Sequence, residues 1–186
     1  GDRVVAGGRF NDGLVNDAGH VRVYKYNTGS WTQIGADING KTANTYFGWS
    51  VDMNAAGDMI VATAPNEDNQ KGLARIYRNV GNTWVQVGQD IFGESNNDYS
   101  GGADGNSVSI NDIGDKVVIG AWQNDGGGSN SGHVRVYGLE KGFWYKLGFD
   151  LDGEDSDDYL GWSVAINAAG DIVASGAQLN DGGGSN

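Results

Sequence analysis

The sequence predicts an all-β protein made of β-propeller blades of four antiparallel strands, in about three and a third repeats of 56–57 residues. Composition and periodicity carry this prediction. Glycine supplies 33 of 186 residues against one proline, without a Gly-X-Y period, which favours short strands joined by many tight turns. Short runs rich in Val, Ile, Tyr and Trp recur at constant spacing, and no segment has a helical apolar stripe, so we expect few helices.

A Gly-Asp pair followed by a small apolar run marks each repeat. The pair lies at Gly1, Gly57, Gly114 and Gly170, at spacings of 56, 57 and 56 residues. Three more patterns keep the same phase: Gly-x-x-Arg-x-Tyr, Trp-x-x-x-Gly and Gly-x-Ser-Val. A solenoid is the alternative, but its repeats are usually shorter and its strands parallel. We therefore treat the chain as one partial propeller, 1–186, divided into repeats 1–56, 57–113, 114–169 and an incomplete 170–186.

Each repeat contains strand-sized runs, which in the second repeat are residues 50–53, 59–64, 73–78 and 84–88. The first two runs are joined by Asn-Ala-Ala-Gly at 54–57. Asn at the first and Gly at the fourth position predict a type I turn closed by a left-handed glycine, and hence an antiparallel hairpin. The run 59–64 and its counterparts are continuously apolar and small, so we expect them near the central axis, buried on both faces.

Three repeat-equivalent tryptophans, Trp31, Trp84 and Trp144, are predicted to seal one blade against the next. Burying one Trp removes about 150–250 Å² from water, roughly 4–6 kcal/mol gross. Propellers usually close with four to eight blades, so we expect a fragment of a larger ring, or a ring completed by another chain. Open blade edges would then allow self-association.

Charge and composition exclude several classes of function. The net charge of −12 repels phosphate backbones, and no Lys/Arg stripe offsets it, so we expect no nucleic-acid partner. No apolar run approaches the roughly 20 residues that span a bilayer, so we expect no membrane insertion. The absence of cysteine removes disulfides, thiolate metal sites and cysteine nucleophiles together.

Three segments in order, 47–51 (Phe-Gly-Trp-Ser-Val), 57–65 and 72–77, resemble the FG-GAP repeat of integrin-alpha-type β-propellers. The resemblance covers essentially the whole chain. The Phe-Gly pair itself occurs once, and the other repeats have Ser100-Gly101 and Leu160-Gly161 in its place. The resemblance implies an extracellular or cell-surface module of adhesion or ligand binding.

Many members of that family bind calcium in the loop between the first two strands. Here the loops 54–58 and 167–171 are too short and lack the several carboxylates that calcium requires. We expect a plain hairpin there instead of the family's calcium site.

The acidic segment 150–158 is the best metal candidate, because carboxylates at alternating positions can supply oxygens to Ca²⁺. The alternative is a solvated surface loop. The candidate ligands are Asp152, Glu154, Asp155, Asp157 and Asp158.

A recurring Asn-Asp-Gly loop is expected on one rim of the ring, with an aromatic residue before two of its copies. Asn, Asp and Gly each favour turns, so the loop is either a plain turn or a ligand contact. A shallow rim of Asp, Asn and an aromatic ring suits a carbohydrate. The candidate ligand-binding residues are Phe10, Asn11, Asp12, Trp122, Asn124, Asp125, Asn180 and Asp181.

Nothing in the sequence forms a recognisable catalytic set. His20 and His133 occupy matching positions at the start of a strand in their repeats, without local Cys or His partners, so we expect structural roles. The glycines at 126–128 lack the Lys-Ser/Thr of a phosphate loop. Notable residues recur once per blade, whereas an active site is normally asymmetric. We therefore expect a protein that is not an enzyme and that binds a glycan or an extracellular protein. The alternatives are an architectural subunit of a surface assembly or filament, and the propeller portion of a secreted hydrolase.

Overall fold

A computed structural model of the chain describes residues 1–104 and 106–182. Its strands form four separate antiparallel sheets, which we call blades 1 to 4. Blade 1 contains β1 (Arg3–Gly8), β2 (His20–Asn27), β3 (Ser30–Gln33) and β4 (Ile38–Asn39). Blade 2 contains β5 (Val51–Met53), β6 (Met59–Ala64), β7 (Leu73–Val80), β8 (Thr83–Gln86) and β9 (Ile91–Phe92). Blade 3 contains β10 (Val108–Ile110), β11 (Lys116–Ala121), β12 (His133–Glu140) and β13 (Phe143–Asp152). Blade 4 contains β14 (Leu160–Ile166) and β15 (Val173–Ala177).

The pairing within the blades confirms the predicted four-stranded antiparallel unit. Blade 2 has the order β5-β6-β7-β8 and blade 3 the order β10-β11-β12-β13. Helix is scarce, as expected: the only helical segment among the described residues is α1 (Glu67–Gln70), a single turn between β6 and β7. No helix in this part of the chain is long and apolar enough to span a bilayer.

The fourth strand is more complicated than the sequence predicts. In blades 1 and 2 it is broken, and its second piece, β4 or β9, returns to pair with β2 or β7. Gly35 and Gly88 lie at the break with positive φ values of 71° and 73°. In blade 3 the strand is continuous as β13, with a register shift opposite Val134 and Val136. The equivalent Gly148 again has a positive φ of 72°, so the bend is retained as a bulge.

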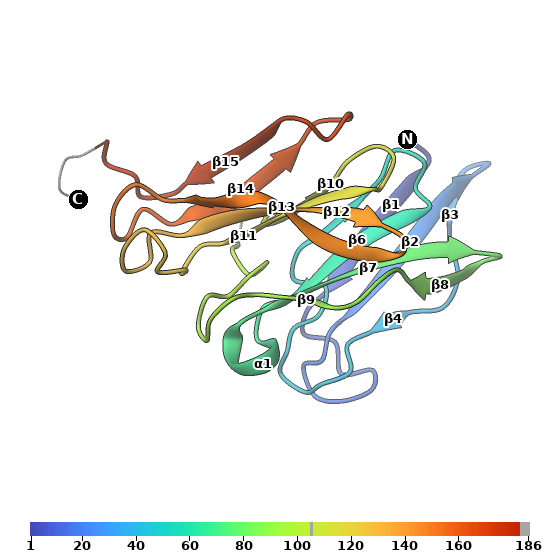
Figure 1. Cartoon of the computed structure of the whole chain (residues 1–186). Coiled ribbons are helices and arrows are strands. Elements are labelled where there is room, and N and C mark those ends of the chain that lie inside the picture. The colour runs from blue at the N-terminus through green and yellow to red at the C-terminus, as the bar shows by residue number, and fades with distance from the viewer. Residues whose placement is uncertain (105, 183–186) are drawn as a thin grey trace.

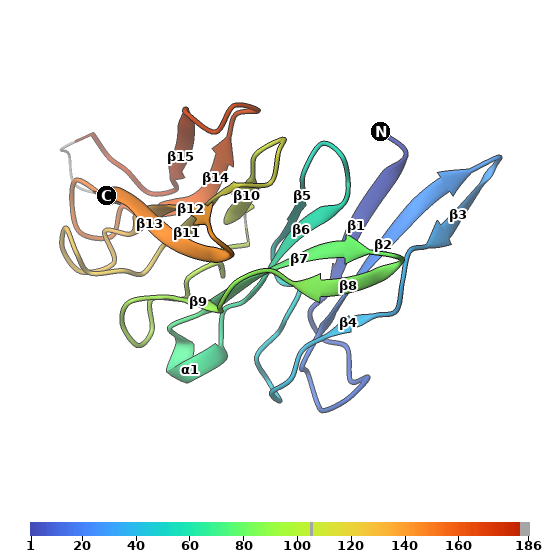
Figure 2. The same cartoon turned by 45° about the vertical axis from the view of Figure 1, so that its right-hand side comes forward.

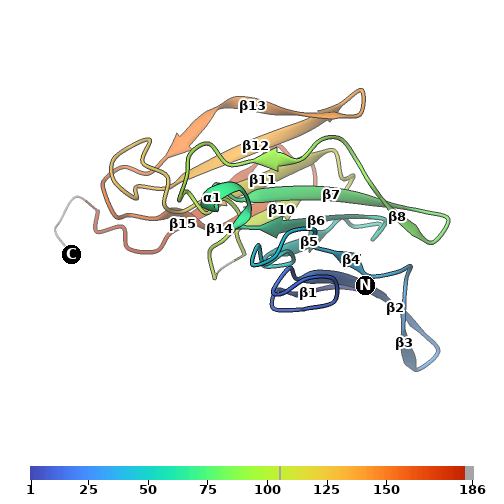
Figure 3. The same ribbon diagram turned by 90° about the horizontal axis from the view of Figure 1, so that it is seen from below.

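The blades follow one another in chain order, from the blue sheet of β1–β3 to the red pair β14 and β15 (Figures 1 and 2). Seen from below, blades 1 and 3 lie on opposite sides of blade 2 (Figure 3). The first strands converge, because β5 contacts β10 and β10 contacts β14. The strand at 59–64 is therefore the second of its blade, next to the first strand, and it is buried along its whole length, as expected. Blades 1 and 3, stacked on either side, bury its two faces.

Alternate residues of β6 enter two different cores. Ile60 and Ala62 pack with blade 1 residues such as Val21 and Val23. Met59 and Val61, which point to the other face, pack with blade 3 residues such as Val117 and Trp144. A smaller core joins blades 3 and 4 through Val118, Val134 and Val164. The hydrophobic core of this protein is thus a series of inter-blade layers.

The Asn-Ala-Ala-Gly segment forms the predicted hairpin. Asn54 Oδ1 accepts hydrogen bonds from the amides of Asp58 and Met59, at 3.1 and 2.9 Å, and Asn54 Nδ2 donates to Asp58 Oδ1 at 2.8 Å. Gly57 takes the left-handed conformation, with φ of 66°. The same contacts recur at Asn111 and Asn167. The plain hairpin expected in place of the family's calcium loop is therefore present.

Two of the three sealing tryptophans are confirmed. Trp144 is 2% exposed, and Trp84 is half-buried against blade 1. Trp31 is 49% exposed, because the face of blade 1 on which it lies carries no blade in the described residues. Val4, Ala6 and Tyr24 join Trp31 in lining an apolar hollow of about 410 Å³ on that face.

Glycine is required where one blade begins against its neighbour. A side chain at Gly120 would collide with the carbonyl oxygen of Gly161, near the start of β14 in blade 4. Gly7 meets Gly48 in the same way. The equivalent of Gly48 in blade 3 is Gly101, whose amide donates to Gly120 O just as that of Gly48 donates to Thr63 O. The sequence marker at Gly105 lies outside the described residues, as do residues 183–186 of the incomplete repeat.

Candidate functional site

The two ends of the blades differ. The hairpin turns between first and second strands gather at one end, and the longer connections gather at the other (Figure 2). We call the second end the loop face. It consists of the connections between second and third strands and the connections between successive blades. Hydrogen bonds tie the two kinds of connection together, for example from Asn16 Nδ2 to Asn44 Oδ1 at 3.2 Å and from Asn130 Nδ2 to Asp157 Oδ1 at 2.9 Å.

Three repeat-equivalent tyrosines on the loop face have a left-handed backbone. Tyr46, Tyr99 and Tyr159 have φ values of 61°, 49° and 60°. For a bulky side chain this conformation is an outlier that costs about 1–3 kcal/mol, and such strain concentrates at functional sites. The consequence here is that each tyrosine ring turns onto an aromatic neighbour.

Trp122 lies at the centre of the larger aromatic group. Its ring centroid is 5.1 Å from that of Trp162, 5.2 Å from Tyr159 and 6.1 Å from Tyr99. The group joins three blades, because Tyr99 follows blade 2, Trp122 follows β11 of blade 3, and Trp162 lies in β14 of blade 4. All four side chains are partly exposed. Among the described residues, Trp122 Nε1 is buried without a hydrogen-bond acceptor.

A second aromatic group lies between blades 1 and 2. Tyr46 packs 5.4 Å from Phe10 and 5.9 Å from Trp49, measured between ring centroids. The guanidinium of Arg9 lies 3.9 Å from the Trp49 ring centroid, a cation–π contact. Phe10 is 58% exposed, so this group also presents an aromatic ring to solvent.

The Asn-Asp-Gly loops are turns that also join blades. Asn124 Oδ1 accepts from the amide of Gly126 at 2.8 Å, and its Nδ2 donates at 3.0 Å to Asp98 Oδ2 in the connection that leaves blade 2. Asn180 donates in the same way to Asp158 Oδ2, at 2.9 Å. The equivalent of Asn124 in blade 2 is Glu67, which accepts instead of donating, from Thr42 Oγ1 at 3.0 Å.

The acidic residues of these loops also serve the turn. Asp12 Oδ1 accepts from the amide of Asp17 at 2.8 Å, and Asp125 Oδ1 accepts from the amide of Asn130 at 2.8 Å. Asn11 accepts from the amide of Gly13 at 2.9 Å. Asp181 lies at the same place in the third copy. The turn alternative therefore describes these residues, and contact with a ligand stays a prediction.

The acidic segment 150–158 does not act as one cluster. Asp152, Glu154 and Asp158 line a hollow of about 260 Å³ together with Asn180. Asp158 is 3% exposed and accepts from the amide of Asp155 at 3.0 Å. The carboxylates of Asp155 and Asp157 do not line the hollow, and Asp157 accepts from Asn130 instead.

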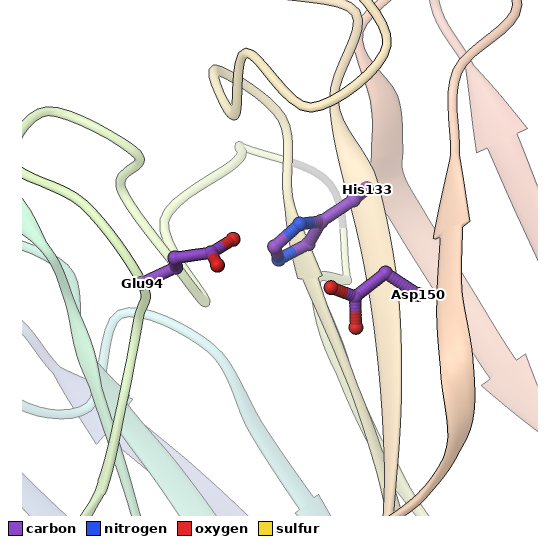
Figure 4. Close-up of side chains that lie close together, drawn as sticks. All are labelled: Glu94, His133 and Asp150. Atoms are coloured by element: carbon purple, nitrogen blue, oxygen red, sulfur yellow. The ribbon is translucent and has the colours of Figure 1, made fainter.

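In the part of the chain that the structure describes, the one group of three metal-binding side chains is Glu94, His133 and Asp150 (Figure 4). One ligand atom from each lies within 4.8 Å of the others. His133 and Asp150 belong to blade 3, and Glu94 belongs to the connection that leaves blade 2. Arg135 lies among them, and its NH2 donates at 2.7 Å to both Glu94 Oε2 and Asp150 Oδ2.

Each of the first three blades contains an Arg–Asp pair at the same position. Arg22–Asp37, Arg75–Asp90 and Arg135–Asp150 are bidentate, with both distances of each pair between 2.7 and 2.9 Å. The guanidinium of Arg22, with help from Gln33, lowers the pKa of Asp37 to about 2. Arg75 and Arg135 lower the pKa values of Asp90 and Asp150 in the same way. The arginines are therefore each neutralised within a blade.

The two histidines also occupy repeat-equivalent sites beside these pairs. Burial, followed by the charge of Arg135, lowers the pKa of His133 below its usual 6.5. Burial and Arg22 do the same for His20. Nδ1 of each histidine is buried without a hydrogen-bond partner among the described residues. An unsatisfied buried polar atom costs about 1–3 kcal/mol of stability. A purely structural role for the two histidines therefore does not account for burying each Nδ1 without a partner.

Sequence reasoning found part of the loop face. It selected Phe10 and Trp122, and the structure places both in aromatic groups. It missed Tyr46, Tyr99 and Tyr159, although a tyrosine at one position of three successive repeats was a usable signal. It also missed Glu94, which lies 39 residues before His133 and has Lys41 at the equivalent position of blade 1.

The first of two matching solved structures supports the β-propeller fold. A candidate 6-phosphogluconolactonase from Bacteroides uniformis matches with a TM-score of 0.55 and 11% sequence identity over 86% of this chain and 41% of that one. TolB from Acinetobacter baumannii matches with a TM-score of 0.48 and 13% identity over 90% of this chain and 35% of that one. This chain thus spans well under half the length of either protein. No protein-family model and no curated protein matches the sequence.

The first of these neighbours corrects the expectation that the chain is not an enzyme. That expectation rested on residues that recur once per blade. A protein described as an enzyme has the same fold over most of this chain, so repetition among blades does not exclude catalysis. At 11% identity the likeness shows the fold alone and transfers no reaction or substrate.

Proposed function

We propose that this chain is the ligand-binding part of an extracellular or cell-surface β-propeller and that it binds a glycan on the loop face. The observation that carries the proposal is the aromatic group of Trp122, Tyr99, Tyr159 and Trp162. The left-handed tyrosines at two of these positions are strained, and strain of this kind is retained where function requires it.

The chemistry of the loop face suits a sugar. One face of a sugar ring presents C–H groups, which pack on an aromatic ring, and its hydroxyl groups both donate and accept hydrogen bonds. Asp125, which is exposed, lies three residues after Trp122 in the sequence, and its carboxylate can accept hydrogen bonds from sugar hydroxyl groups. The extracellular assignment is supported by the resemblance of the three marker segments to the FG-GAP repeat and by the acidic surface.

Screening the protein against a glycan array, followed by calorimetric titration of the best ligand, tests this function. Trp122→Ala removes the central ring, and we expect it to weaken binding by roughly 30-fold, about 2 kcal/mol. Trp31→Ala is the matched control, because Trp31 is exposed on a blade face away from the loop face. Failure of the native protein to bind any glycan, or equal losses in the two variants, would contradict the proposal.

A second candidate function is architectural, and the open face of blade 1 favours it. The apolar hollow at Val4, Ala6, Tyr24 and Trp31 lies where the other blades receive a neighbour. A second copy of the chain that packed one of its blades against this hollow would bury these side chains. Sedimentation velocity tests this: a dimer that Trp31→Glu converts to monomer supports it, and a monomer at all concentrations contradicts it.

A further inference from the structure

We propose that Glu94, His133 and Asp150 form a binding site for a divalent transition-metal ion, with Zn²⁺ as the cation that fits, at the junction of blades 2 and 3. The three ligand atoms already lie within 4.8 Å of one another. Figure 4 shows the imidazole ring of His133 between the two carboxylates. The site goes beyond glycan binding and does not depend on it.

The histidine supplies evidence independent of the two acids. His133 is 2% exposed, and its Nδ1 has no hydrogen-bond partner among the described residues. A buried imidazole normally makes hydrogen bonds through its nitrogens. A buried ring that lies between two carboxylates and has an unpaired nitrogen is arranged as a metal ligand would be.

The donor set selects the cation. One imidazole nitrogen and two carboxylate oxygens form a set that Zn²⁺ accepts, and three protein ligands leave a fourth position open to water. Calcium prefers six to eight oxygen ligands and gains little from a histidine. We therefore expect this site to discriminate strongly in favour of Zn²⁺.

Arg135 is the competing group, and its geometry sets the expected strength. Its NH2 donates to Glu94 Oε2 and to Asp150 Oδ2, and its Nε donates to Asp150 Oδ1 at 2.8 Å. Lys146 Nζ also donates to Asp150 Oδ1, at 2.9 Å, and Asn124 Nδ2 lies 3.4 Å from Glu94 Oε2. Each carboxylate has about four lone-pair positions, so these contacts fill Asp150 Oδ1 but leave a position on Asp150 Oδ2 and the Oε1 atom of Glu94 for a metal ion. The two cations balance the charge of the two acids, however. We expect affinity well below that of a structural zinc site.

The site occurs at only one of the described junctions. In blade 2 the histidine position holds Leu73, and Lys41, near enough to lower the pKa of Asp90, holds the position of Glu94. In blade 1, His20 Nδ1 lies 3.7 Å from Asp37 Oδ2, which supplies two of the three ligand types. The third ligand would come from a preceding blade, which the described residues do not include. His20 therefore serves as the matched control for His133, because its site lacks the third ligand.

Calorimetric titration of the chelator-treated protein with ZnCl₂ tests the site, with Co²⁺ absorption as a second readout of coordination. We expect one bound ion per chain, with binding weakened by at least about tenfold in Glu94→Gln and His133→Gln and unchanged in His20→Gln. Glu94 is 51% exposed, so Glu94→Gln tests the site even where His133→Gln fails to fold. Lack of Zn²⁺ binding at millimolar concentration, unchanged affinity in Glu94→Gln, or an equal loss in His20→Gln would overturn the proposal.

Discussion

Trp144 Nε1, in blade 3, donates a hydrogen bond of 2.9 Å to the carbonyl oxygen of Val87 in blade 2. Gln89 of blade 2 strengthens the contact, since its side-chain amide bonds to both the amide and the carbonyl of Trp144, at 3.0 and 2.6 Å. Trp84 makes the same bond one blade earlier, to Ile34 O at 2.9 Å. The blades are therefore joined by a repeated side-chain-to-backbone contact as well as by apolar packing.

Replacing Trp144 should destabilise the protein much more than replacing Trp31, its exposed equivalent in blade 1. Trp144→Ala removes a buried ring and an inter-blade hydrogen bond, and we expect the free energy of unfolding to fall by about 3–5 kcal/mol. Trp31→Ala, at a 49% exposed position, should cost less than about 1 kcal/mol. Urea unfolding followed by circular dichroism measures both. Equal costs would show that blade stacking does not bury Trp144.

The Arg75–Asp90 pair should contribute more stability than its counterpart in blade 1. The Arg75 side chain is 7% exposed, so Asp90→Asn leaves a buried charge without its carboxylate, and we expect a loss of about 2–3 kcal/mol. Arg22 is 39% exposed, and Asp37→Asn should cost at most about 1 kcal/mol. Chemical denaturation at pH 7 compares them. A larger loss of stability in Asp37→Asn than in Asp90→Asn would contradict the conclusion that the more buried pair contributes more.

The same pair predicts a pH dependence. Arg75 lowers the pKa of Asp90 in the folded protein, whereas an unfolded Asp titrates near a pKa of about 3.9. The stability that the pair contributes is therefore fully present above about pH 5 and is lost as the pH falls through the folded pKa. The difference in unfolding free energy between the native protein and Asp90→Asn should shrink below about pH 4. A difference that stays constant down to pH 2 would contradict the lowered pKa.

The hairpin asparagines should be required for stability. Asn111 is 1% exposed, and its Oδ1 accepts from the amides of Asp115 and Lys116 at 3.1 and 2.9 Å. Asn111→Ala leaves both amides without their acceptor, so we expect a loss of about 2–3 kcal/mol. Asp112→Ala, at the exposed next position, should change the unfolding free energy by less than about 0.5 kcal/mol. Thermal unfolding measures the loss of stability in both variants. Equal losses would contradict a structural role for Asn111.

Calcium binding at the acidic hollow is a separate prediction. Asp152, Glu154 and Asp158 line it with Asn180, but Asp158 is already engaged by an amide and by Asn180. We therefore expect weak binding, with a dissociation constant in the millimolar range of about 10⁻⁴–10⁻³ M. Calorimetric titration after chelation should show a small heat that Glu154→Gln removes and Asp155→Asn retains. The absence of heat at millimolar Ca²⁺ would end the prediction.

The fold was predictable to the extent that it is local. The Asn-x-x-Gly turns and the short apolar strands are determined by residues within about ten positions of one another. The same patterns recur in successive repeats, which makes them easy to recognise. The burial of residues 59–64 on both faces was predictable from their continuous run of small apolar residues. The second piece of the fourth strand was missed because only two residues of it pair in β4 or β9.

The candidate sites likewise contain residues that local sequence identified and residues that meet only through long-range contacts. Trp122 was selected because it lies next to an Asn-Asp-Gly turn, yet its partners Tyr159 and Trp162 come from a later segment. Glu94 and His133 meet only when blade 2 packs on blade 3. Contacts of this kind depend on the relative rotation of two blades, which no local pattern encodes.

The stacking of blades is tested most directly by a nuclear Overhauser experiment on the indole N–H of Trp144. The hydrogen bond to Val87 O places this proton beside blade 2, so cross-peaks to the side-chain protons of Val87 and to the amide side chain of Gln89 are expected. The Trp84 indole should likewise show cross-peaks to Ile34. An intact blade 3 whose Trp144 proton shows contacts only within its own sheet would contradict the propeller arrangement.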